Sequence, residues 1–360
     1  MNYCAEWGTD KKAAWSGTRW SLEQALRKYF EITDIELESP NLCQRAKSRI
    51  AKKIGAWDFD MGQLARQQLK LNGEAPAGGD VWFQFGEAPM PRKGERHYIY
   101  QDVAVEWVAH CSAETPEIYR WTPFQGISPH AMAERLALQR ELYSRVTGIF
   151  IMGKWMADYL VNEVGVPSEK VFHVGGGVNS FSSLSAERGG NTFLFAGRRD
   201  HRLKGGDLVL EAFKLLHDEN PDLKLVIAGS AKNFGEGVEG VEFVGDVSTD
   251  ELGRLFSRCD VFCMPSRFDA YGLVFPEAKV AGLPCVGRNA FEMPHFIQDG
   301  VNGRLINSDD PVEMACAMRD CLTNGSIREN ARAQADDARA EYSWDAVAER
   351  IYRVIIKDCD

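Results

Sequence analysis

The sequence lacks long apolar runs, a secretory leader pattern and any cluster of cysteines. No stretch of about 18 apolar residues occurs, so we expect no membrane-spanning helix. The N-terminal MNYCAEWGTD lacks the basic-then-apolar layout of a signal peptide and predicts a first strand instead. The nine cysteines are scattered singly, and the closest pair, Cys259 and Cys263, flanks an apolar run rather than forming a metal knuckle. We therefore expect reduced thiols and a cytoplasmic protein.

The sequence also lacks a basic excess, internal repeats and low-complexity segments. Its net charge of −10 argues against general nucleic-acid binding, which depends on neutralising phosphates. The hydrophobic content of 44% is that of a globular protein, and 360 residues suffice for two domains of ordinary size. Two globular domains without a nucleic-acid partner are therefore expected.

Short apolar runs alternate with amphipathic helical stretches along nearly the whole chain. The runs that predict strands in the first half cover residues 2–7, 34–38, 81–86, 97–102, 148–153 and 170–176. Those in the second half cover residues 192–197, 223–229, 241–245, 260–265, 283–287 and 303–306. This alternation is typical of α/β architecture with parallel sheets. We predict two doubly wound Rossmann-like domains facing a cleft, with ligands beyond the carboxyl ends of the strands.

A Ser- and Gly-rich segment marks the boundary between these domains. Residues 181–191 have no core periodicity and predict a linker between domains at 1–180 and 192–342. Residues 343–360 predict an amphipathic helix with Ser343 as its N-cap. This last helix is a candidate to cross back to the first domain.

Three loops that follow predicted strands of the second domain carry cations or glycine. The loop AGRRDHRLKGGD, 196–207, presents Arg198 and Lys204 before a helix. Two cations there suit a diphosphate, since Arg binds bidentately and Lys as a point charge. Two further loops hold Gly229 and Gly245, where glycine lets the backbone approach a ligand closely. Taken singly, these features also fit a solvated basic loop and ordinary turns.

A fourth loop, SRFDAYGLVFPEA at 266–278, places two carboxylates around a helix start. Pro276 is tolerated only near the beginning of a helix, which predicts a start at about residues 272–274. The N–H groups expected to form an anion site there belong to Tyr271, Gly272 and Leu273. Asp269 before this site and Glu277 behind it would accept hydroxyl hydrogen bonds from a sugar nucleotide. Each acid alone also fits an ordinary residue near a helix N-terminus.

These blocks resemble the C-terminal domain of the GT-B glycosyltransferases of family 4. The segments GRRDHRLKGGDLVLEAF, LKLVIAG, VEFVGDV, SRFDAYGLVFPEAKVAGLP and QDGVNGRLI occur in the family's order and spacing, over about residues 192–310. The resemblance implies that Arg198 and Lys204 bind the donor diphosphate. It also implies that Glu277 holds the ribose and that Asp269 touches the transferred sugar. The family pair is usually Glu, seven residues, Glu, so Asp269 departs from the pattern while the spacing is kept.

The first half resembles the family more weakly and would form the acceptor-binding domain. WSGTRWSLEQAL, 15–26, stands where the family has a glycine loop and first helix, which makes Gly17 and Thr18 candidate site residues. KVFHVGGGVNSF, 170–181, stands where a Pro-Asn-Gly-Val-Asp segment is common. Asp102 lies near the place where many relatives carry a functional His or Asp facing the donor sugar. His110 is the alternative to Asp102.

The resemblance implies a retaining transfer of a sugar from a nucleotide diphospho-sugar, UDP- or GDP-linked, to a glycan or lipid-linked acceptor. The predicted catalytic residues are Asp102, Asp269, Arg198 and Lys204. Cations and helix N–H groups can stabilise the leaving diphosphate, and no Asp-x-Asp motif ends a predicted strand, so we predict no metal and no cofactor. Two alternatives stay open: a nucleotide-sugar epimerase or phosphorylase of the same architecture, and a non-catalytic sugar-nucleotide-binding protein.

A basic amphipathic stretch, NLCQRAKSRIAKKIGAW at 41–57, has an apolar arc flanked by lysines and arginines with no acid between them. Helices of this kind lie on anionic membrane surfaces. They also occur as ordinary surface helices packed on a sheet. The stretch is therefore a candidate for peripheral contact with the inner face of a membrane.

Overall fold

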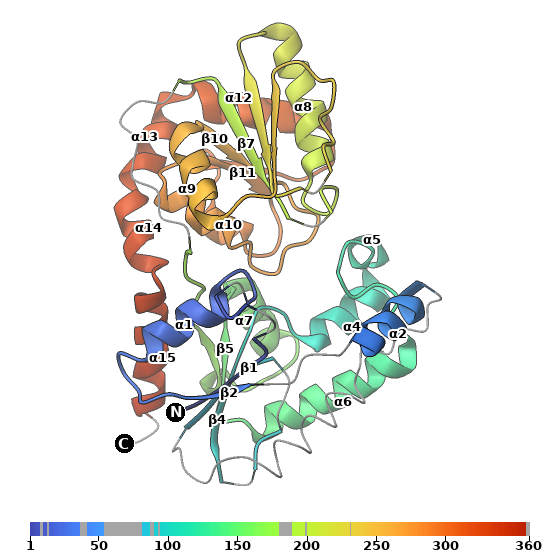
Figure 1. The fold of residues 1–360 in the computed structure, drawn as a ribbon, viewed down its shortest axis with the longest axis vertical. Coiled ribbons are helices and arrows are strands. Elements are labelled where there is room, and N and C mark those ends of the chain that lie inside the picture. The colour runs from blue at the N-terminus through green and yellow to red at the C-terminus, as the bar shows by residue number, and fades with distance from the viewer. Residues whose placement is uncertain are drawn as a thin grey trace. The chain divides into compact units, whose positions relative to one another are not determined.

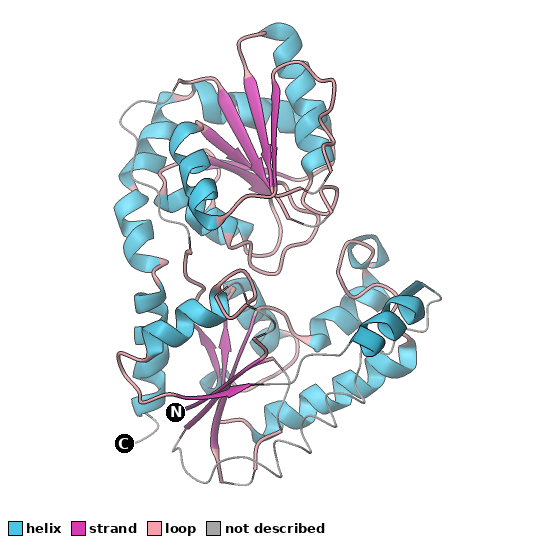
Figure 2. Ribbon diagram, in the orientation of Figure 1, coloured by secondary structure: helices cyan, strands magenta, loops and turns pink. Residues whose placement is uncertain are grey.

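The computed structural model describes residues 1–7, 10–12, 14–36, 42–53, 81–86, 90–92, 94–179, 189–198, 200–230 and 232–357. The chain divides into two compact units. The first comprises Met1–Gly176 with Val347–Asp360, and the second comprises Gly177–Ala346. Most of the predicted linker, residues 181–188, lies outside the described residues. Each unit is an α/β body built on one parallel sheet (Figures 1 and 2).

The first unit contains a six-stranded parallel sheet in the order β2-β1-β3-β4-β5-β6. Its strands are β1 (Asn2–Ala5), β2 (Thr33–Glu36), β3 (Val81–Phe85), β4 (Arg96–Gln101), β5 (Gly148–Ile151) and β6 (Val171–His173). Its helices are α1 (Thr18–Leu26), α2 (Leu42–Lys53), α4 (Val105–Glu114), α5 (Pro116–Tyr119), α6 (Pro129–Arg145), α7 (Lys154–Asn162), the 3-10 turn η1 (Ser168–Lys170) and, from Val347 onward, α15 (Trp344–Lys357).

The second unit contains a six-stranded parallel sheet in the order β12-β11-β10-β7-β8-β9. Its strands are β7 (Thr192–Ala196), β8 (Lys224–Ala228), β9 (Val241–Gly245), β10 (Val261–Cys263), β11 (Cys285–Arg288) and β12 (Gly303–Ile306). Its helices are α8 (Gly206–Glu219), α9 (Thr249–Arg258), α10 (Val274–Val280), α11 (Met293–Phe296), α12 (Pro311–Thr323), α13 (Gly325–Ala333) and α14 (Ala335–Glu341).

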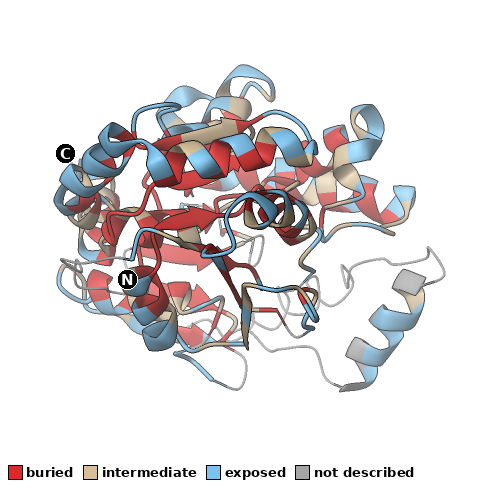
Figure 3. Ribbon diagram, turned by 90° about the horizontal axis from the view of Figure 1, so that it is seen from above, coloured by how far each residue is buried: buried red, intermediate tan, exposed pale blue. Residues whose placement is uncertain are grey.

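The central strands of both sheets are buried on both faces, whereas the edge strands β2, β6, β9 and β12 are partly exposed. In β7 the side chains from Phe193 to Ala196 are all buried, because helices cover both faces of a doubly wound parallel sheet. Figure 3 shows most strands as buried elements and shows helices that carry both buried and exposed residues. Every predicted strand is present, and the predicted α/β class with two doubly wound Rossmann-like sheets is confirmed.

Strand order fixes where a ligand can bind in the second unit. The chain runs outward from β7 through β8 to β9, then returns to the other side of β7 for β10, β11 and β12. The order therefore reverses between β7 and β10, and loops leaving these two strands part to opposite faces. A crevice at the carboxyl ends of such strands is the usual ligand site of an open α/β sheet.

A buried carboxylate holds the starts of these two strands together. Asp260 directly precedes β10 and accepts hydrogen bonds from the backbone N–H groups of Gly190, Asn191 and Thr192 at 2.9–3.0 Å. Its own N–H donates to the Thr192 carbonyl at 2.8 Å. The four bonds fix the entry of the chain into β7, and so fix the register of the two strands that flank the reversal.

The predicted cap of the last helix is also confirmed. Ser343 Oγ accepts a hydrogen bond from the Ala346 N–H at 3.1 Å, and α15 begins at Trp344. Among the described residues, no helix has both the length and the apolar composition that a bilayer crossing requires.

Candidate active site

Two predicted site residues meet at the strand reversal of the second unit. Lys204 follows β7, and Asp269 follows β10. Lys204 Nζ lies 2.6 Å from Asp269 Oδ2, and the two side chains are only 18% and 15% exposed. The sequence predicts both residues near one ligand but does not predict that they form an ion pair with each other. The pair places a cation and a carboxylate where a ligand of a doubly wound sheet is expected.

Glycines line the same carboxyl edge of the sheet. Gly229 after β8 has a φ of +80°, and a Cβ there would approach the backbone of Gly197 to 3.1 Å. Its N–H donates to the carbonyl of Gly245, which ends β9 with a φ of +72°. Both positions use the left-handed region that glycine adopts without strain. The glycines therefore let three loop ends approach one another at this edge.

Arg198 lies toward a different loop of the same edge. Its side chain is 58% exposed; Nη2 donates to the Val247 carbonyl at 3.1 Å, and Nε lies 3.5 Å from Asp246 Oδ1. These contacts turn the guanidinium toward the loop after β9. A diphosphate would therefore meet Lys204 in a half-buried position and Arg198 in a solvated one.

The helix start that follows Asp269 comes slightly later than Gly272. Gly272 has a φ of +81°, so it forms a turn, and α10 begins at Val274. Tyr271 and Gly272 are buried and Leu273 is half-buried. The Tyr271 ring packs edge-on against Phe296 at 5.2 Å. The predicted helix start within residues 272–274 is confirmed, with Pro276 in its first turn.

Glu277 is buried within α10, with 8% of its surface exposed. Its Oε1 accepts a hydrogen bond from the Asn179 N–H at 3.4 Å. Asn179 in turn accepts from Trp344 Nε1 at 2.8 Å. The sequence did not indicate this link, although Asn179 lies in the segment KVFHVGGGVNSF that was singled out. The signal that could have found it is the glycine run, since close packing demands small residues.

Gly177 shows how close that packing is. A Cβ on Gly177 would lie 2.4 Å from the Trp344 ring, and the Val178 N–H donates to the Tyr342 carbonyl at 2.8 Å. The segment before the linker is thereby fixed to Tyr342 and to Trp344 at the start of α15. This arrangement holds Asn179 against Glu277.

The predicted residues of the first unit lie at the carboxyl edge of their own sheet. Gly17 has a φ of +84° and caps α1, and the Thr18 side chain is fully buried. Trp15 and Ser16 also have positive φ, at 48° and 55°, which is rare for residues other than glycine. The loop after β1 therefore makes a tight left-handed turn into α1, where the family's glycine loop was expected.

Asp102 and His110 differ in position. Asp102 directly follows β4 and is half-buried at the carboxyl edge. His110 lies on α4, is exposed, and its ring centroid is 6.2 Å from that of Tyr159. Only Asp102 stands at a strand end, where ligands of such sheets bind.

Among the residues that the structure describes, no group of three or more His, Cys, Asp or Glu side chains is arranged to hold a metal ion. Arg267 also lies in the stretch 266–278, and the sequence did not single it out; its side chain contacts Asp207 and Asp309.

Comparison with known proteins identifies the second unit. Residues 179–338 match the model of the family described as glycosyl transferases group 1. The second unit belongs to the glycosyl transferases group 1 family. The match contains Arg198, Lys204, Asp269 and Glu277, and so covers the whole candidate site of this unit.

Two of the curated relatives are named for phosphorylated inositol compounds. The phosphatidyl-myo-inositol mannosyltransferase of Mycobacterium leprae is 28% identical over 226 residues, which is 59% of this chain and 59% of that protein. The D-inositol 3-phosphate glycosyltransferase of Streptomyces coelicolor is 31% identical over 173 residues, which is 43% of this chain and 38% of that protein. The matches thus span less than two thirds of these relatives.

Solved structures extend the likeness to the whole chain at the level of fold. A sucrose-phosphate synthase from Thermosynechococcus elongatus has a TM-score of 0.68 and 14% identity, covering 100% of this chain and 99% of that one. The glycosyltransferase WaaG, involved in lipopolysaccharide biosynthesis, has a TM-score of 0.65 and 18% identity, covering 98% and 99%. The chain has the GT-B fold.

Proposed function

We propose that this protein transfers a sugar from a nucleotide diphospho-sugar to a glycan or lipid-linked acceptor, with retention of anomeric configuration and without a metal ion. The observation that carries the proposal is the Lys204–Asp269 pair, at 2.6 Å, at the strand reversal of a group 1 family unit. A cation and a carboxylate at this point suit the two parts of such a donor, its diphosphate and its sugar.

The residues have distinct roles in the proposed reaction. Breaking the bond between sugar and diphosphate builds positive charge on the sugar and negative charge on the leaving diphosphate. Lys204 stabilises the developing negative charge, and Arg198 adds a second cation from the loop after β7. Asp269 accepts a hydrogen bond from a sugar hydroxyl, and buried Glu277 accepts from the ribose hydroxyls.

Donor binding requires Lys204 and Asp269 to exchange partners. In the structure each satisfies the other, so neither charge is left without a counter-ion in a half-buried position. We infer that the diphosphate takes over Lys204 while a sugar hydroxyl takes over Asp269. Asp102 at the end of β4 is the proposed catalytic residue of the first unit, and His110 is the alternative.

The donor is proposed to be UDP- or GDP-linked. One structural neighbour, HepE from Anabaena, was solved with UDP and glucose, which supports this class without selecting within it. The test screens UDP-, GDP- and ADP-sugars for thermal stabilisation and for hydrolysis with and without EDTA. A ligand at 100 times its dissociation constant should add about 2.7 kcal/mol to the free energy of unfolding. Stabilisation without any hydrolysis or transfer would mean that the chain is a binding protein. The absence of both stabilisation and turnover with every donor would overturn the proposal.

We further propose that α2 contacts an anionic membrane surface at the inner face of the membrane. The helix spans Leu42–Lys53, and Lys47, Arg49 and Ile50 on it are exposed, the last at 62%. An exposed isoleucine beside cations suits a surface with apolar depth and negative charge.

Vesicle co-sedimentation tests this contact. The full chain should bind phosphatidylglycerol vesicles at low salt and not pure phosphatidylcholine vesicles. The double variant Lys47→Glu/Arg49→Glu should lose binding, while Lys214→Glu on the surface of α8 should not. Equal binding by the double variant and the wild type would contradict the contact.

A further inference from the structure

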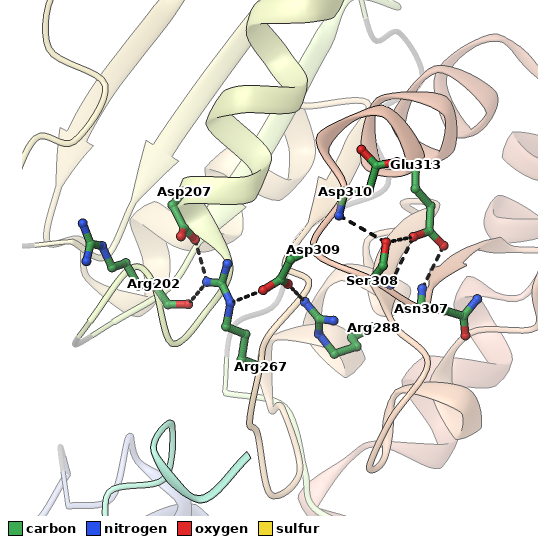
Figure 4. A network of polar contacts seen from close by, with 9 residues as sticks. All are labelled: Arg202, Asp207, Arg267, Arg288, Asn307, Ser308, Asp309, Asp310 and Glu313. Atoms are coloured by element: carbon green, nitrogen blue, oxygen red, sulfur yellow. Dashed lines mark hydrogen bonds and ion pairs between the residues drawn. The ribbon is translucent and has the colours of Figure 1, made fainter. Parts of the chain in front are cut away.

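One arginine of the second unit joins three loops at the carboxyl edge of the sheet, as Figure 4 shows. Arg267 Nη1 donates to Asp207 Oδ1 at 2.7 Å and to the backbone carbonyl of Arg202, and Nε donates to Asp309 Oδ2 at 2.9 Å. The Arg267 N–H donates to the Leu203 carbonyl at 2.9 Å. These bonds reach the loop after β7, the first turn of α8 and the loop after β12.

The guanidinium is held as a charged group in a largely buried place. Its side chain is 10% exposed, whereas its partners Asp207 and Asp309 are 36% and 48% exposed. Burial opposes the charged form, but the hydrogen bonds to both carboxylates outweigh it, so the pKa of Arg267 is raised. Partial burial likewise opposes the charge on Asp309, and the two arginines that it contacts lower its pKa. Removing a partner would leave a charge uncompensated in a largely buried place, so these contacts are costly to break.

A second arginine fixes the far side of this junction. Arg288 ends β11, and its Nη2 donates to Asp309 Oδ1. Asp309 therefore bridges Arg267 and Arg288 with its two oxygens. The loop after β12 is held to β11 as well as to the loop after β10.

The junction acts on both members of the candidate catalytic pair. Leu203, whose carbonyl accepts from Arg267, directly precedes Lys204, and Asp269 lies two residues after Arg267. The loops also touch at Gly205, where a Cβ would lie 2.5 Å from the Pro265 carbonyl oxygen. The 2.6 Å separation between Lys204 Nζ and Asp269 Oδ2 thus depends on the relative position of two loops that Arg267 joins by both backbone and side chain.

We propose that Arg267 is a positioning residue for the sugar transfer, which holds the Lys204 loop and the Asp269 loop at the separation that the reaction requires. The proposal rests on the proposed function. Lysine at this position would keep the charge but lose the fork that reaches Asp207, Asp309 and the Arg202 carbonyl together. A displacement of about 1 Å between reacting groups costs up to about 100-fold in rate.

The test measures steady-state kinetics of the full chain with a donor that the wild type turns over. Arg267→Lys should lower kcat at least about tenfold while the KM for the donor changes less than about threefold, because Glu277, the proposed ligand of the ribose, lies on α10 and not on the two loops that Arg267 joins. Arg267→Ala should lower kcat further than Arg267→Lys does. Guanidinium chloride should restore part of the kcat of Arg267→Ala, and sodium chloride at the same concentration should not. The matched control is Arg258→Lys, which alters an exposed arginine paired with Glu242 away from this edge and should leave kcat unchanged.

Thermal unfolding separates positioning from stability. Kinetics are compared at a temperature where each variant is fully folded. A kcat of Arg267→Lys within twofold of the wild type would overturn the proposal. A loss of kcat in both Arg267 variants with no guanidinium rescue and a parallel rise in KM would overturn it too. If the wild type turns over no donor, the proposed function is overturned and the positioning role falls with it, an outcome distinct from a failure that is confined to the Arg267 variants.

Discussion

At the scale of the residue, the candidate site is defined by the neighbours of its four charged side chains. Lys204 and Asp269 neutralise each other at 2.6 Å, Arg198 is solvated beside Asp246, and Glu277 is buried against the Asn179 N–H. The sequence proposed all four residues from their types and spacing. The sequence did not show that Lys204 is half-buried while Arg198 is exposed. Because of this difference, we expect the two substitutions to lower activity unequally.

Replacing Lys204 with Ala should lower kcat/KM by about 10²- to 10³-fold, or about 3–4 kcal/mol, because a half-buried partner of the developing charge is lost. Arg198→Ala should lower kcat/KM by less than Lys204→Ala does, because water already screens the Arg198 guanidinium. Steady-state kinetics check both, with Lys214→Ala on α8 as the control. Near-wild-type turnover by Lys204→Ala would remove it from the site.

Asp269→Glu tests the shorter acid. The added methylene lengthens the side chain that now meets Lys204, so it should disturb the sugar more than the nucleotide. We expect a change in donor preference or a fall in kcat of about tenfold or more, with the affinity for the nucleoside diphosphate nearly unchanged. Competition kinetics with several sugars on one nucleotide measure this. Identical sugar preference in variant and wild type would show that the length of the acid does not matter.

At the scale of the element, strand ends and close approaches position these groups. Asp260 ties the starts of β7 and β10, and Gly177 lets the segment before the linker lie on Trp344. Strands and helices were predictable because their apolar periodicity is local. The Gly177–Trp344 contact was not, because it joins residues 167 positions apart, by their numbers, and the sequence carries no local sign of it.

Gly177→Ala should destabilise the second unit by about 1–3 kcal/mol, because the new Cβ would lie only 2.4 Å from the Trp344 ring and the backbone would have to move. It should also weaken nucleotide binding through the displaced Asn179–Glu277 contact. Urea unfolding and nucleotide titration measure the two effects. Gly325→Ala is the control, since a Cβ there meets nothing within 4 Å. Equal stability of the two variants would contradict the packing argument.

At the scale of the whole molecule, stability should depend on pH through one buried histidine. His97 on β4 is fully buried; its Nε2 lies 2.6 Å from Gln84 Oε1, and its ring stacks on Trp82. Glu95 Oε2 lies 3.8 Å from Nδ1. Burial lowers the pKa of His97 from 6.5 to about 3.

The sign of the effect follows from proton binding. Between pH 3 and 6.5 the unfolded chain binds a proton on this histidine and the folded chain does not. The contribution of neutral His97 to the free energy of unfolding should therefore be complete above pH 6.5. On acidification the free energy of unfolding should fall, by about 2 kcal/mol between pH 7 and pH 5. Urea unfolding at both pH values, followed by tryptophan fluorescence, checks this. His97→Gln should flatten the dependence, whereas the exposed His110→Gln should leave it intact. An unchanged dependence in His97→Gln would assign it to other groups.

The sequence by itself determined the α/β class, the strands, the Ser343 cap and four residues of the second-unit site, because hydrophobic periodicity, capping residues, glycine and proline act over a few residues. The order of the strands, and with it the meeting of Lys204 and Asp269 across the reversal between β7 and β10, was decided by the tertiary structure. The same holds for Arg267, whose acceptors lie 60 and 42 positions away in the chain. Such contacts depend on which loops the sheet brings to one edge, and spacing along the chain carries no record of that.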